Sequence, residues 1–512
     1  MLHMVLLLMF NGALSHELSN DHPSVGIIHR KVALILGQWV SEVKDETKRA
    51  VYCGLIRLLQ DKDLSVRLAA CRSLCLHIED ANFSEEKFSD LLPLCWDSCF
   101  KLIEEVEEFD SKVQVLNLIS VLIGHIREVL PFAEKLVRFF QKVWEESSGE
   151  SLLQIQLLIA LKNFVVALDY QSPCSYTILL PILHWGIDIN NPDELNLLED
   201  SLLLWETTLS HAPAVVPQLL TYFPCLVGIL EKSFDHLQVA ISIFESYIIL
   251  GGNEFFSTHV SSISKLIDFI VGNVNDKGLL LILPVMDLLI QCYPAQVLPL
   301  ITSSLQKLFI ICLSGGDDYD HSKTAVKASS AALFARILVM DINYFVQLTA
   351  EPSTLLLLQQ AGISNDENLL LRVVDLLIDR VDNASVSQRK MYGLALSVVL
   401  TLNLPQLLDR LDQILSVCTT VIMSGNEHLN EEDFSVDSMS SIKNHDEDVI
   451  PTKEFRKRQI KSSDPINKIL LEDSVRVNLE ACAALHGDAF NTAISKMHGR
   501  ALEQLKMALK MG

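Results

Sequence analysis

The sequence lacks the short motifs that carry chemistry in enzymes. It contains no G-x-x-x-x-G-K, no G-x-G-x-x-G, no H-E-x-x-H and no G-x-S-x-G, so nucleotide phosphate loops, zinc hydrolase helices and serine nucleophile turns are not indicated. Its 15 histidines do not cluster with acids or cysteines at metal-ligand spacing. We therefore expect a protein that works by binding, with no catalytic residue, no cofactor and no metal.

Basic side chains are outnumbered by acidic ones. The chain has 64 acidic against 41 basic residues and a net charge of −23. A field of that sign repels phosphate backbones and attracts basic proteins. Nucleic acid is therefore not an expected ligand, whereas a basic protein is.

Disulfide frameworks and membrane spans are also not indicated. The 11 cysteines are scattered and odd in number, which is typical of buried thiols in a reducing compartment. The longest uncharged run, Thr207–Leu230, is interrupted by Pro213, Pro217 and Pro224. We therefore expect no contact with a membrane.

What the sequence does contain is a repeat of apolar helices. An acidic residue opens an apolar helical pattern at intervals of 40 to 47 residues. These residues are Asp63, Asp110, Glu150, Asp193, Asp235, Asp276 and Asp320. A period in the low forties is typical of HEAT and armadillo helix pairs. The fold class predicted is therefore an all-α HEAT/armadillo-like helical-repeat superhelix, an α-α solenoid.

One repeat matches the HEAT pattern D-x-x-V-R-x-x-A-x-x-x-L residue by residue. Asp63, Val66, Arg67, Ala70 and Leu74 occupy its positions. In that pattern the Arg pairs with an Asp of a neighbouring repeat. We therefore expect Asp63 and Arg67 to belong to a ladder between repeats, and replacing Arg67 to lower stability.

Composition divides the chain into four parts. Residues 1–25 form an atypical N-terminal segment, because Met1–Phe10 is apolar but lacks the basic start of a signal peptide. Residues 26–423 form the solenoid, 424–462 an acidic-then-basic flexible linker, and 463–512 a set of C-terminal helices. A helical pattern resumes at Pro465, for which Asp464 is the expected cap.

The acidic part of the linker is the candidate partner-binding segment. It is too poor in aliphatic residues to bury a core, so we expect it to be disordered and to attract basic partners. Its acidic residues are Glu427, Glu431, Glu432, Asp433, Asp437, Asp446, Glu447 and Asp448. A mere spacer is the alternative interpretation.

Three further patterns have an ordinary and a functional interpretation. Four thiols, from the i,i+4 pairs Cys71/Cys75 and Cys95/Cys99, could hold zinc or could be core residues. Ser314–Asp320 is expected to be a plain loop rather than a calcium site. The basic run Lys453–Lys461 could be a solvated linker, a nuclear localisation signal or an intramolecular contact with the acidic stretch beside it.

Four segments resemble the importin-β (karyopherin-β) receptors, specifically the importin eleven type. They are HRKVALILGQWVSEVK (His29–Lys44), LLQDKDLSVRLAACRSLCL (Leu58–Leu76), KRQIKSSDPINKILLEDSV (Lys457–Val475) and ACAALHGDAF (Ala481–Phe490). The resemblance runs from about Asn11 to the C-terminus. Its motifs are structural, so it indicates a lineage rather than a chemical site.

The resemblance implies a monomeric nuclear import receptor that shuttles between cytoplasm and nucleus. Such receptors carry protein cargo, here expected to be basic, and contact FG-repeat nucleoporins through apolar slots between helices. The chain corresponds to the C-terminal half, and the N-terminal domain that grips RanGTP is missing, which puts RanGTP binding in doubt. The alternative function is a static HEAT-repeat scaffold for complex assembly, which the fold alone does not separate from a receptor.

Overall fold

The structure, a computed structural model, describes residues 12, 15–18, 25–191, 194–314, 320–364, 367–428 and 453–510. These residues form α-helices and short 3-10 helices, and no strand occurs among them. The chain divides into two compact units, Met1–Ile229 and Leu230–Gly512. The prediction of an all-α helical-repeat fold is confirmed.

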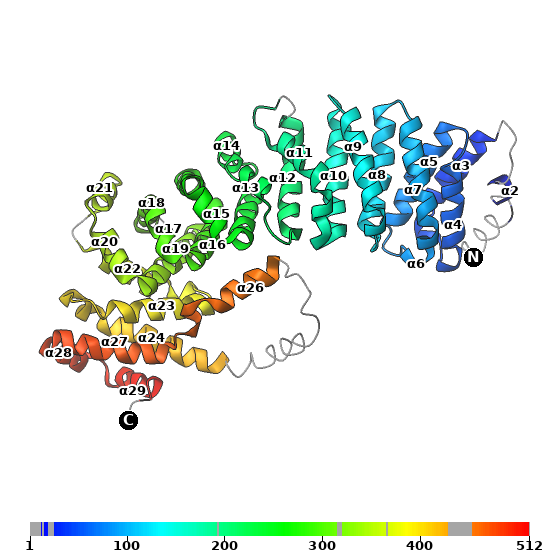
Figure 1. The fold of residues 1–512 in the computed structure, drawn as a ribbon. Coiled ribbons are helices and arrows are strands. Elements are labelled where there is room, and N and C mark those ends of the chain that lie inside the picture. Colours follow the sequence, from blue (N-terminus) through cyan, green and yellow to red (C-terminus); the bar gives the residue numbers. More distant parts are fainter. Residues whose placement is uncertain are drawn as a thin grey trace. The chain divides into compact units, whose positions relative to one another are not determined.

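The first unit is a double row of helices (Figure 1). Its helices are α2 (Ser15–Leu18), α3 (Gly26–Gln38), α4 (Asp45–Leu58), α5 (Leu64–Glu79), α6 (Glu85–Phe88), α7 (Leu92–Glu105), α8 (Phe109–His125), α9 (Ala133–Glu146), α10 (Ser151–Leu168), α11 (Tyr176–Ile187), α12 (Glu194–His211) and α13 (Pro217–Tyr222), with 3-10 turns η2 (Val40–Glu42), η3 (Ser89–Leu91), η4 (Leu130–Phe132) and η5 (Asp169–Ser175). Helices α3, α5, α8, α10 and α12 pack successively on one another. Helices α4, α7, α9 and α11 form the second row, each packed on the helix that follows it.

The second unit repeats this arrangement with a more elaborate end. After α14 (Cys225–Lys232), which spans the boundary, come α15 (Leu237–Asn273), α16 (Asp276–Cys292), α17 (Pro294–Val297), η6 (Leu298–Leu300), α18 (Thr302–Leu313), α19 (His321–Met340), α20 (Ile342–Ala350), α21 (Pro352–Gln360), α22 (Leu369–Arg380), η7 (Val381–Asn383), α23 (Val386–Val399), η8 (Pro405–Arg410), α24 (Leu411–His428), α26 (Lys453–Ser463), η9 (Pro465–Lys468), α27 (Leu471–His486), α28 (Asp488–Lys496) and α29 (Gly499–Ala508). Helices α15, α16, α19, α23 and α27 pack successively in one row.

The repeat period correctly located the helices, but only some acidic residues cap them. Asp63 and Asp320 each accept a hydrogen bond at 2.9 Å from the backbone N–H two residues on, at the starts of α5 and α19. At α16 the cap is Asn275, which accepts from Gly278 N at 3.1 Å. Asp276 therefore lies one residue inside the helix, where a negative charge still favours the positive end of the helix dipole.

The remaining acidic positions lie near helix starts without a capping bond from the side chain. Asp110 is in the first turn of α8, and Glu150 has the cap position of α10 but its side chain accepts no capping bond. Asp235 precedes His236, the residue before α15, and accepts a hydrogen bond from Ser233 Oγ at 2.7 Å. Asp193 lies outside the described residues.

Two helical stretches are interrupted in the structure. Helix α20 ends at Ala350 and α21 begins at Pro352, because proline removes an N–H and disfavours a helical residue before it. In α15 the backbone breaks at Gly252, with φ 52° and ψ −149°. Residues other than glycine rarely adopt that backbone conformation.

Close packing between neighbouring helices depends on small residues. A Cβ on Gly37 of α3 would lie 2.4 Å from Ser73 Oγ of α5, and one on Gly186 of α11 would lie 1.9 Å from Ser201 Oγ of α12. The larger core residues, among them Trp96 and Trp205, are buried. Each repeat therefore buries its apolar faces against its neighbours, as expected for a solenoid.

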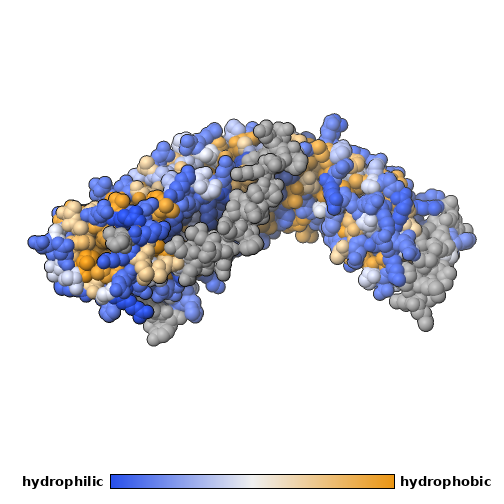
Figure 2. Space-filling view, turned by 90° about the horizontal axis from the view of Figure 1, so that it is seen from below, coloured by the Kyte–Doolittle hydropathy of each residue, from blue (hydrophilic) through white to orange (hydrophobic). Residues whose placement is uncertain are grey.

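Two helical stretches have the length and hydrophobicity of membrane spans, which the sequence interpretation had not anticipated. Ser151–Ile187 and Leu237–Asn273 are long and apolar enough to cross a membrane by length and composition, and two bent helix pairs would raise this to four. Of the 18 most apolar consecutive residues in each stretch, 50% and 56% respectively are buried inside the protein. The face in Figure 2 shows hydrophobic residues as separate patches among hydrophilic ones. Packing within the solenoid thus accounts for the hydrophobicity of these stretches.

Candidate protein-binding surface

A basic helix from the expected linker lies against the second unit. Helix α26 packs on α15, so residues 453–462 differ from the flexible linker expected there. Lys457 Nζ donates to Glu245 Oε1 at 2.6 Å, and Lys453 Nζ lies 3.5 Å from Glu245 Oε2. Lys453 Nζ also donates to the carbonyl of Ser242 at 3.4 Å, one turn before Glu245. The basic run therefore makes an intramolecular contact with the solenoid at Glu245, whereas the acidic stretch beside it lies almost wholly outside the described residues.

A buried ion network fixes the end of this helix to the solenoid. Arg336 of α19 donates to Asp464 Oδ2 at 2.7 Å and also to Asp287 of α16. The side chains of Arg336 and Asp464 are only 7% and 5% exposed. Asp464 also caps η9, as expected, by accepting from Ile466 N at 3.0 Å. Because buried charges are stable only when paired, these three residues form a structural latch.

A cavity with both charged and apolar lining lies beside the latch, within the second unit. Its volume is about 380 Å³. Carboxylates of Glu245, Asp287 and Asp464 and the cationic groups of Lys457 and Lys461 line it, together with side chains of α16, α19 and α23. Burial lowers the pKa of Lys390, a lysine of α23 whose Nζ donates to Asn467 O at 3.0 Å.

An aromatic groove occurs in the first unit. It has a volume of about 880 Å³ and is lined by Phe83, Phe88, Leu92, Ile126 and Phe132, with charged residues at its rim. Glu85 at the rim accepts from Arg127 N at 2.7 Å. A concave surface with an aromatic floor and a polar rim suits a short apolar peptide.

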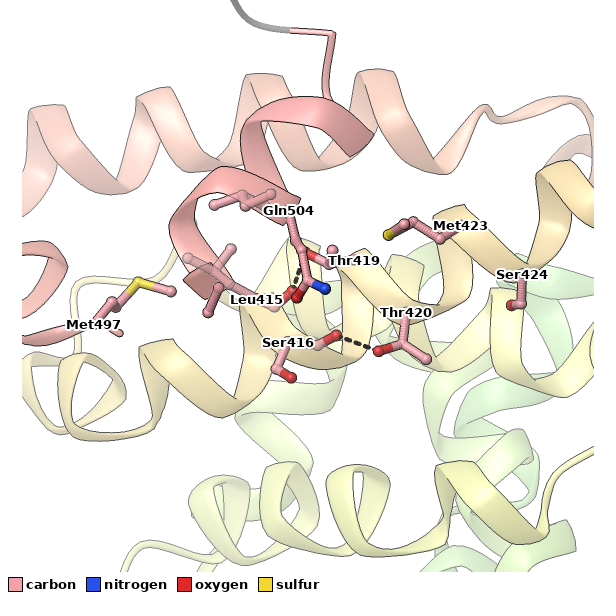
Figure 3. A pocket seen from close by; sticks show the side chains of 10 residues that line it. Leu415, Ser416, Thr419, Thr420, Met423, Ser424, Met497 and Gln504 are labelled. Carbon is pink, nitrogen blue, oxygen red and sulfur yellow. Dashed lines mark hydrogen bonds between the residues drawn. The ribbon is translucent and has the colours of Figure 1, made fainter. Parts of the chain in front are cut away.

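A smaller groove lies between α24 and the last helices of the second unit. It measures about 280 Å³ and is lined along α24 by Leu415, Ser416, Thr419, Thr420, Met423 and Ser424, which face Met497, Ala501, Gln504 and Leu505 (Figure 3). The hydroxyls of Thr419 and Thr420 donate to carbonyls of their own helix at 2.7 Å and 2.9 Å. Among the described residues, no charged side chain lines this groove, so its chemistry is weakly polar and does not specify a ligand.

The predicted ladder residues have separate roles in the structure. Arg67 of α5 donates to Glu105 at the end of α7, in the next repeat. This hydrogen bond lowers the pKa of the Glu105 carboxyl. The Asp63 carboxylate caps α5 by accepting a hydrogen bond from the backbone N–H of Ser65. The cross-repeat partner of Arg67 is therefore a glutamate rather than an aspartate.

The acidic candidate segment falls almost wholly outside the described residues. This applies to Glu431, Glu432, Asp433, Asp437, Asp446, Glu447 and Asp448, and to the side chain of Glu427 at the end of α24. The residues 315–319 of the expected loop Ser314–Asp320 also lie outside them.

The four cysteines considered for zinc are buried thiols. Hydrogen bonding with Cys75, followed by burial, raises the pKa of Cys71 well above its ordinary value, and Cys95 acts on Cys99 in the same way. In the part of the chain that is described, no group of three or more His, Cys, Asp or Glu is placed to hold a metal ion.

The residues that hold α26 were not predicted from the sequence. Glu245, Asp287 and Arg336 each lie in an otherwise apolar helical stretch. A lone charge in an apolar helix signals a buried or half-buried ion pair, because an unpaired charge there is costly. That signal could have pointed to these three residues, but not to partners more than a hundred residues away.

The chain matches known proteins along most of its length. A family model described as "Importin-11-like, TPR repeats" matches residues 155–510. Importin-11 of Mus musculus is 25% identical over 98% of this chain and 51% of that protein. The Importin beta-like protein kap113 of Schizosaccharomyces pombe is 23% identical over 88% of this chain and 45% of that protein. The chain thus spans about half the length of these curated relatives.

A solved structure shares the fold. Lph2 of S. cerevisiae, a bidirectional nuclear transport receptor, matches with a TM-score of 0.78 at 19% identity, covering 99% of this chain and 54% of that one. At this identity the likeness concerns the fold alone.

Proposed function

The chain belongs to the importin-11-like family, and from this premise we propose that it is a nuclear transport receptor, or a part of one, that binds protein cargo and FG-repeat nucleoporins. The observation that carries the proposal is the family match over residues 155–510, which includes the end of the first unit and nearly all of the second. Import into the nucleus and shuttling between cytoplasm and nucleus follow from the same premise. The named relatives are importins, which favours this role over a static scaffold.

Binding rather than catalysis is the proposed mode of action. Neither the sequence motifs nor the described surfaces combine a nucleophile, a base and an electrophilic site. The relatives are named as transport proteins, and Lph2 is described as a transport receptor. A receptor needs several binding surfaces along one chain, and the repeats of a solenoid supply them.

The aromatic groove of the first unit is the proposed contact for FG repeats. The phenylalanine of a repeat would bury its ring against Phe83 and Phe132, which are half-buried and line the groove. Aromatic rings bury large areas and gain further from edge-to-face contacts. The surrounding charged rim would leave the rest of the peptide in water.

A charge placed in this groove tests the proposed contact. Phe132→Glu should weaken binding of an FG-repeat peptide by roughly tenfold or more, which corresponds to the loss of one important interface residue. The matched control is Leu130→Glu, since Leu130 is 48% exposed and does not line the groove. Fluorescence anisotropy with a labelled peptide gives both values. Equal loss for the two variants, or no binding by the unchanged chain, would remove the groove from the proposal.

Cargo binding requires a separate experiment. Immobilised chain should retain basic proteins from cell extract, because the chain carries a net charge of −23. Adding RanGTP distinguishes a chain that responds to Ran from one that lacks this response. A fluorescent fusion that stays in the cytoplasm when nuclear export is blocked would count against shuttling.

A further inference from the structure

The turn that joins α3 to α4 carries an exposed lysine. Lys44 follows η2 and is the residue before α4. Its backbone is extended, with φ −77° and ψ 160°, and its carbonyl accepts hydrogen bonds from the N–H and the hydroxyl of Thr47, each at 2.9 Å. Its amine has no partner among the residues that the structure describes. The backbone of Lys44 is therefore fixed, whereas its side chain is free to react.

The residues around Lys44 form a recognition pattern. The sequence there is VKDE (Val43–Glu46), and Lys44 is the only lysine of the chain that has an acidic residue two positions on. An aliphatic residue, a lysine, any residue and a glutamate form the pattern that conjugating enzymes of small ubiquitin-like modifiers recognise. The aliphatic side chain packs on the enzyme and the carboxylate pairs with cationic groups of the enzyme, which directs the amine to the enzyme's thioester.

The structure leaves the recognised positions accessible. Glu46 is exposed in the first turn of α4, and its carboxylate has no partner in the described part of the chain. Val43 is half-buried and its backbone is extended, with φ −75° and ψ 109°. Asp45, at the position that the pattern leaves open, is instead held by Lys87, whose Nζ donates to the Asp45 carbonyl at 2.7 Å and pairs with its carboxylate. The contact within the protein thus uses the one position that an enzyme does not need.

We propose that Lys44 is a conjugation site for a small ubiquitin-like protein modifier. The modifier arrives as a thioester between its C-terminal carboxyl group and a cysteine of its conjugating enzyme, which a separate activating enzyme and ATP supply. The ammonium group of Lys44 gives one proton to water, and the neutral amine attacks the thioester carbonyl. An isopeptide C–N bond forms, the C–S bond breaks, and the cysteine leaves as a thiol with the proton that the amine loses.

Lys62 provides the comparison within the same unit. It is exposed in the connection between α4 and α5, and its amine also has no partner among the described residues. Asp61 and Asp63 flank it, but the residue before it is not aliphatic and the residue two positions on is Leu64. Exposure and nearby negative charge are thus common to the two lysines, whereas the pattern is present at Lys44 alone.

Reconstituted conjugation tests the proposal on the full chain. The chain is incubated with a small ubiquitin-like modifier, its activating and conjugating enzymes and ATP, and the linked lysine is identified by mass spectrometry after proteolysis. The unchanged chain should give one product, joined at Lys44. Lys44→Arg should lose this product, and the matched control Lys62→Arg should give the yield of the unchanged chain.

Glu46→Ala separates recognition of the pattern from mere exposure of the lysine. It keeps Lys44 but removes a charge-assisted contact with the enzyme, so conjugation should slow by roughly tenfold or more. Glu42→Ala is the control, because Glu42 is exposed and lies on the other side of Lys44 in the sequence. It should leave the rate unchanged. All four variants alter exposed side chains and should melt at the temperature of the unchanged chain.

Three results would overturn the proposal. The first is an equal yield from Lys44→Arg and the unchanged chain, and the second is an equal rate for Glu46→Ala and Glu42→Ala. The third is no product from the unchanged chain under conditions that modify a peptide carrying the same pattern. Because neither cargo nor nucleoporin takes part in the assay, its outcome is independent of the proposed transport function.

Discussion

Arg336 is the residue on which the packing of the C-terminal helices depends most. It bonds both Asp287 and Asp464, and its side chain is 7% exposed. Removing one member of a buried ion pair leaves the others as uncompensated charges, which costs far more than a surface pair is worth. The intact latch contributes little net stability, but the loss of any one of its charges would be strongly destabilising.

Replacing Arg336 with Met should lower the free energy of unfolding by about 3–5 kcal/mol, because Asp464 would stay buried without a cation. Urea denaturation followed by circular dichroism measures the change. The control is Lys265→Met, which removes an exposed partner of Glu231 in the same unit and should change stability by no more than about 0.5 kcal/mol. Equal effects of the two substitutions would contradict a structural latch.

The Arg67–Glu105 pair predicts how stability depends on pH. Arg67 lowers the pKa of the Glu105 carboxyl below its ordinary value of 4.5. A carboxyl with a lowered folded pKa contributes stability that is present above 4.5 and is lost as the pH falls through the folded pKa. Arg67→Met should therefore be less stable than the unchanged chain at pH 6, and the difference should shrink below pH 4.5.

Thermal melts between pH 3 and pH 6 test this sign. Arg72→Met is the matched control, since Arg72 lies on the same helix and is exposed. A difference that grows on acidification would assign the effect of Arg67 to something other than its pair with Glu105.

At the scale of elements, what could be predicted from sequence depended on local patterns. The helices α5, α8, α10, α12, α15, α16 and α19 were located because each opens with an acidic residue and continues as an apolar run. Helix α26 was missed because its residues are polar, and nothing within it indicates a buried face. Its partners are set by contacts with Ser242 and Glu245, 211 and 212 residues earlier, which no local pattern encodes.

The backbone conformation of Gly252, at the break in α15, predicts a loss of stability when this residue is replaced. Its φ of 52° and ψ of −149° suit only glycine, and Tyr293 Oη donates to its carbonyl at 2.7 Å. Gly252→Ala should destabilise the chain by about 1–3 kcal/mol, although a Cβ would meet no atom within 4 Å. Backbone strain is then the cause, rather than a clash.

Gly499→Ala provides the comparison in a melting experiment. A Cβ there also meets nothing within 4 Å, but Gly499 is the first residue of α29 and its φ is not positive. Alanine should be neutral or slightly stabilising at that position. If both substitutions behave alike, the break at Gly252 carries no strain.

At the scale of the whole molecule, the net charge of −23 favours encounters with basic partners. The acidic segment of residues 429–449 contributes to this field. Deleting it should slow association with a basic protein at low salt and matter little at high salt, since exposed charges are screened beyond roughly 8 Å at physiological ionic strength. Stopped-flow fluorescence measures both rates. Equal rates at low salt would leave the segment as a spacer.

The contact between α26 and Glu245 has a consequence for synthesis, because its two sides lie far apart along the chain. Ser242 and Lys453 are 211 residues apart. At a synthesis rate of about 5–20 residues per second, roughly 10–40 seconds pass on the ribosome between the appearance of Glu245 and that of the lysines that pair with it. In every newly made chain, α15 is therefore complete well before the helix that packs on it.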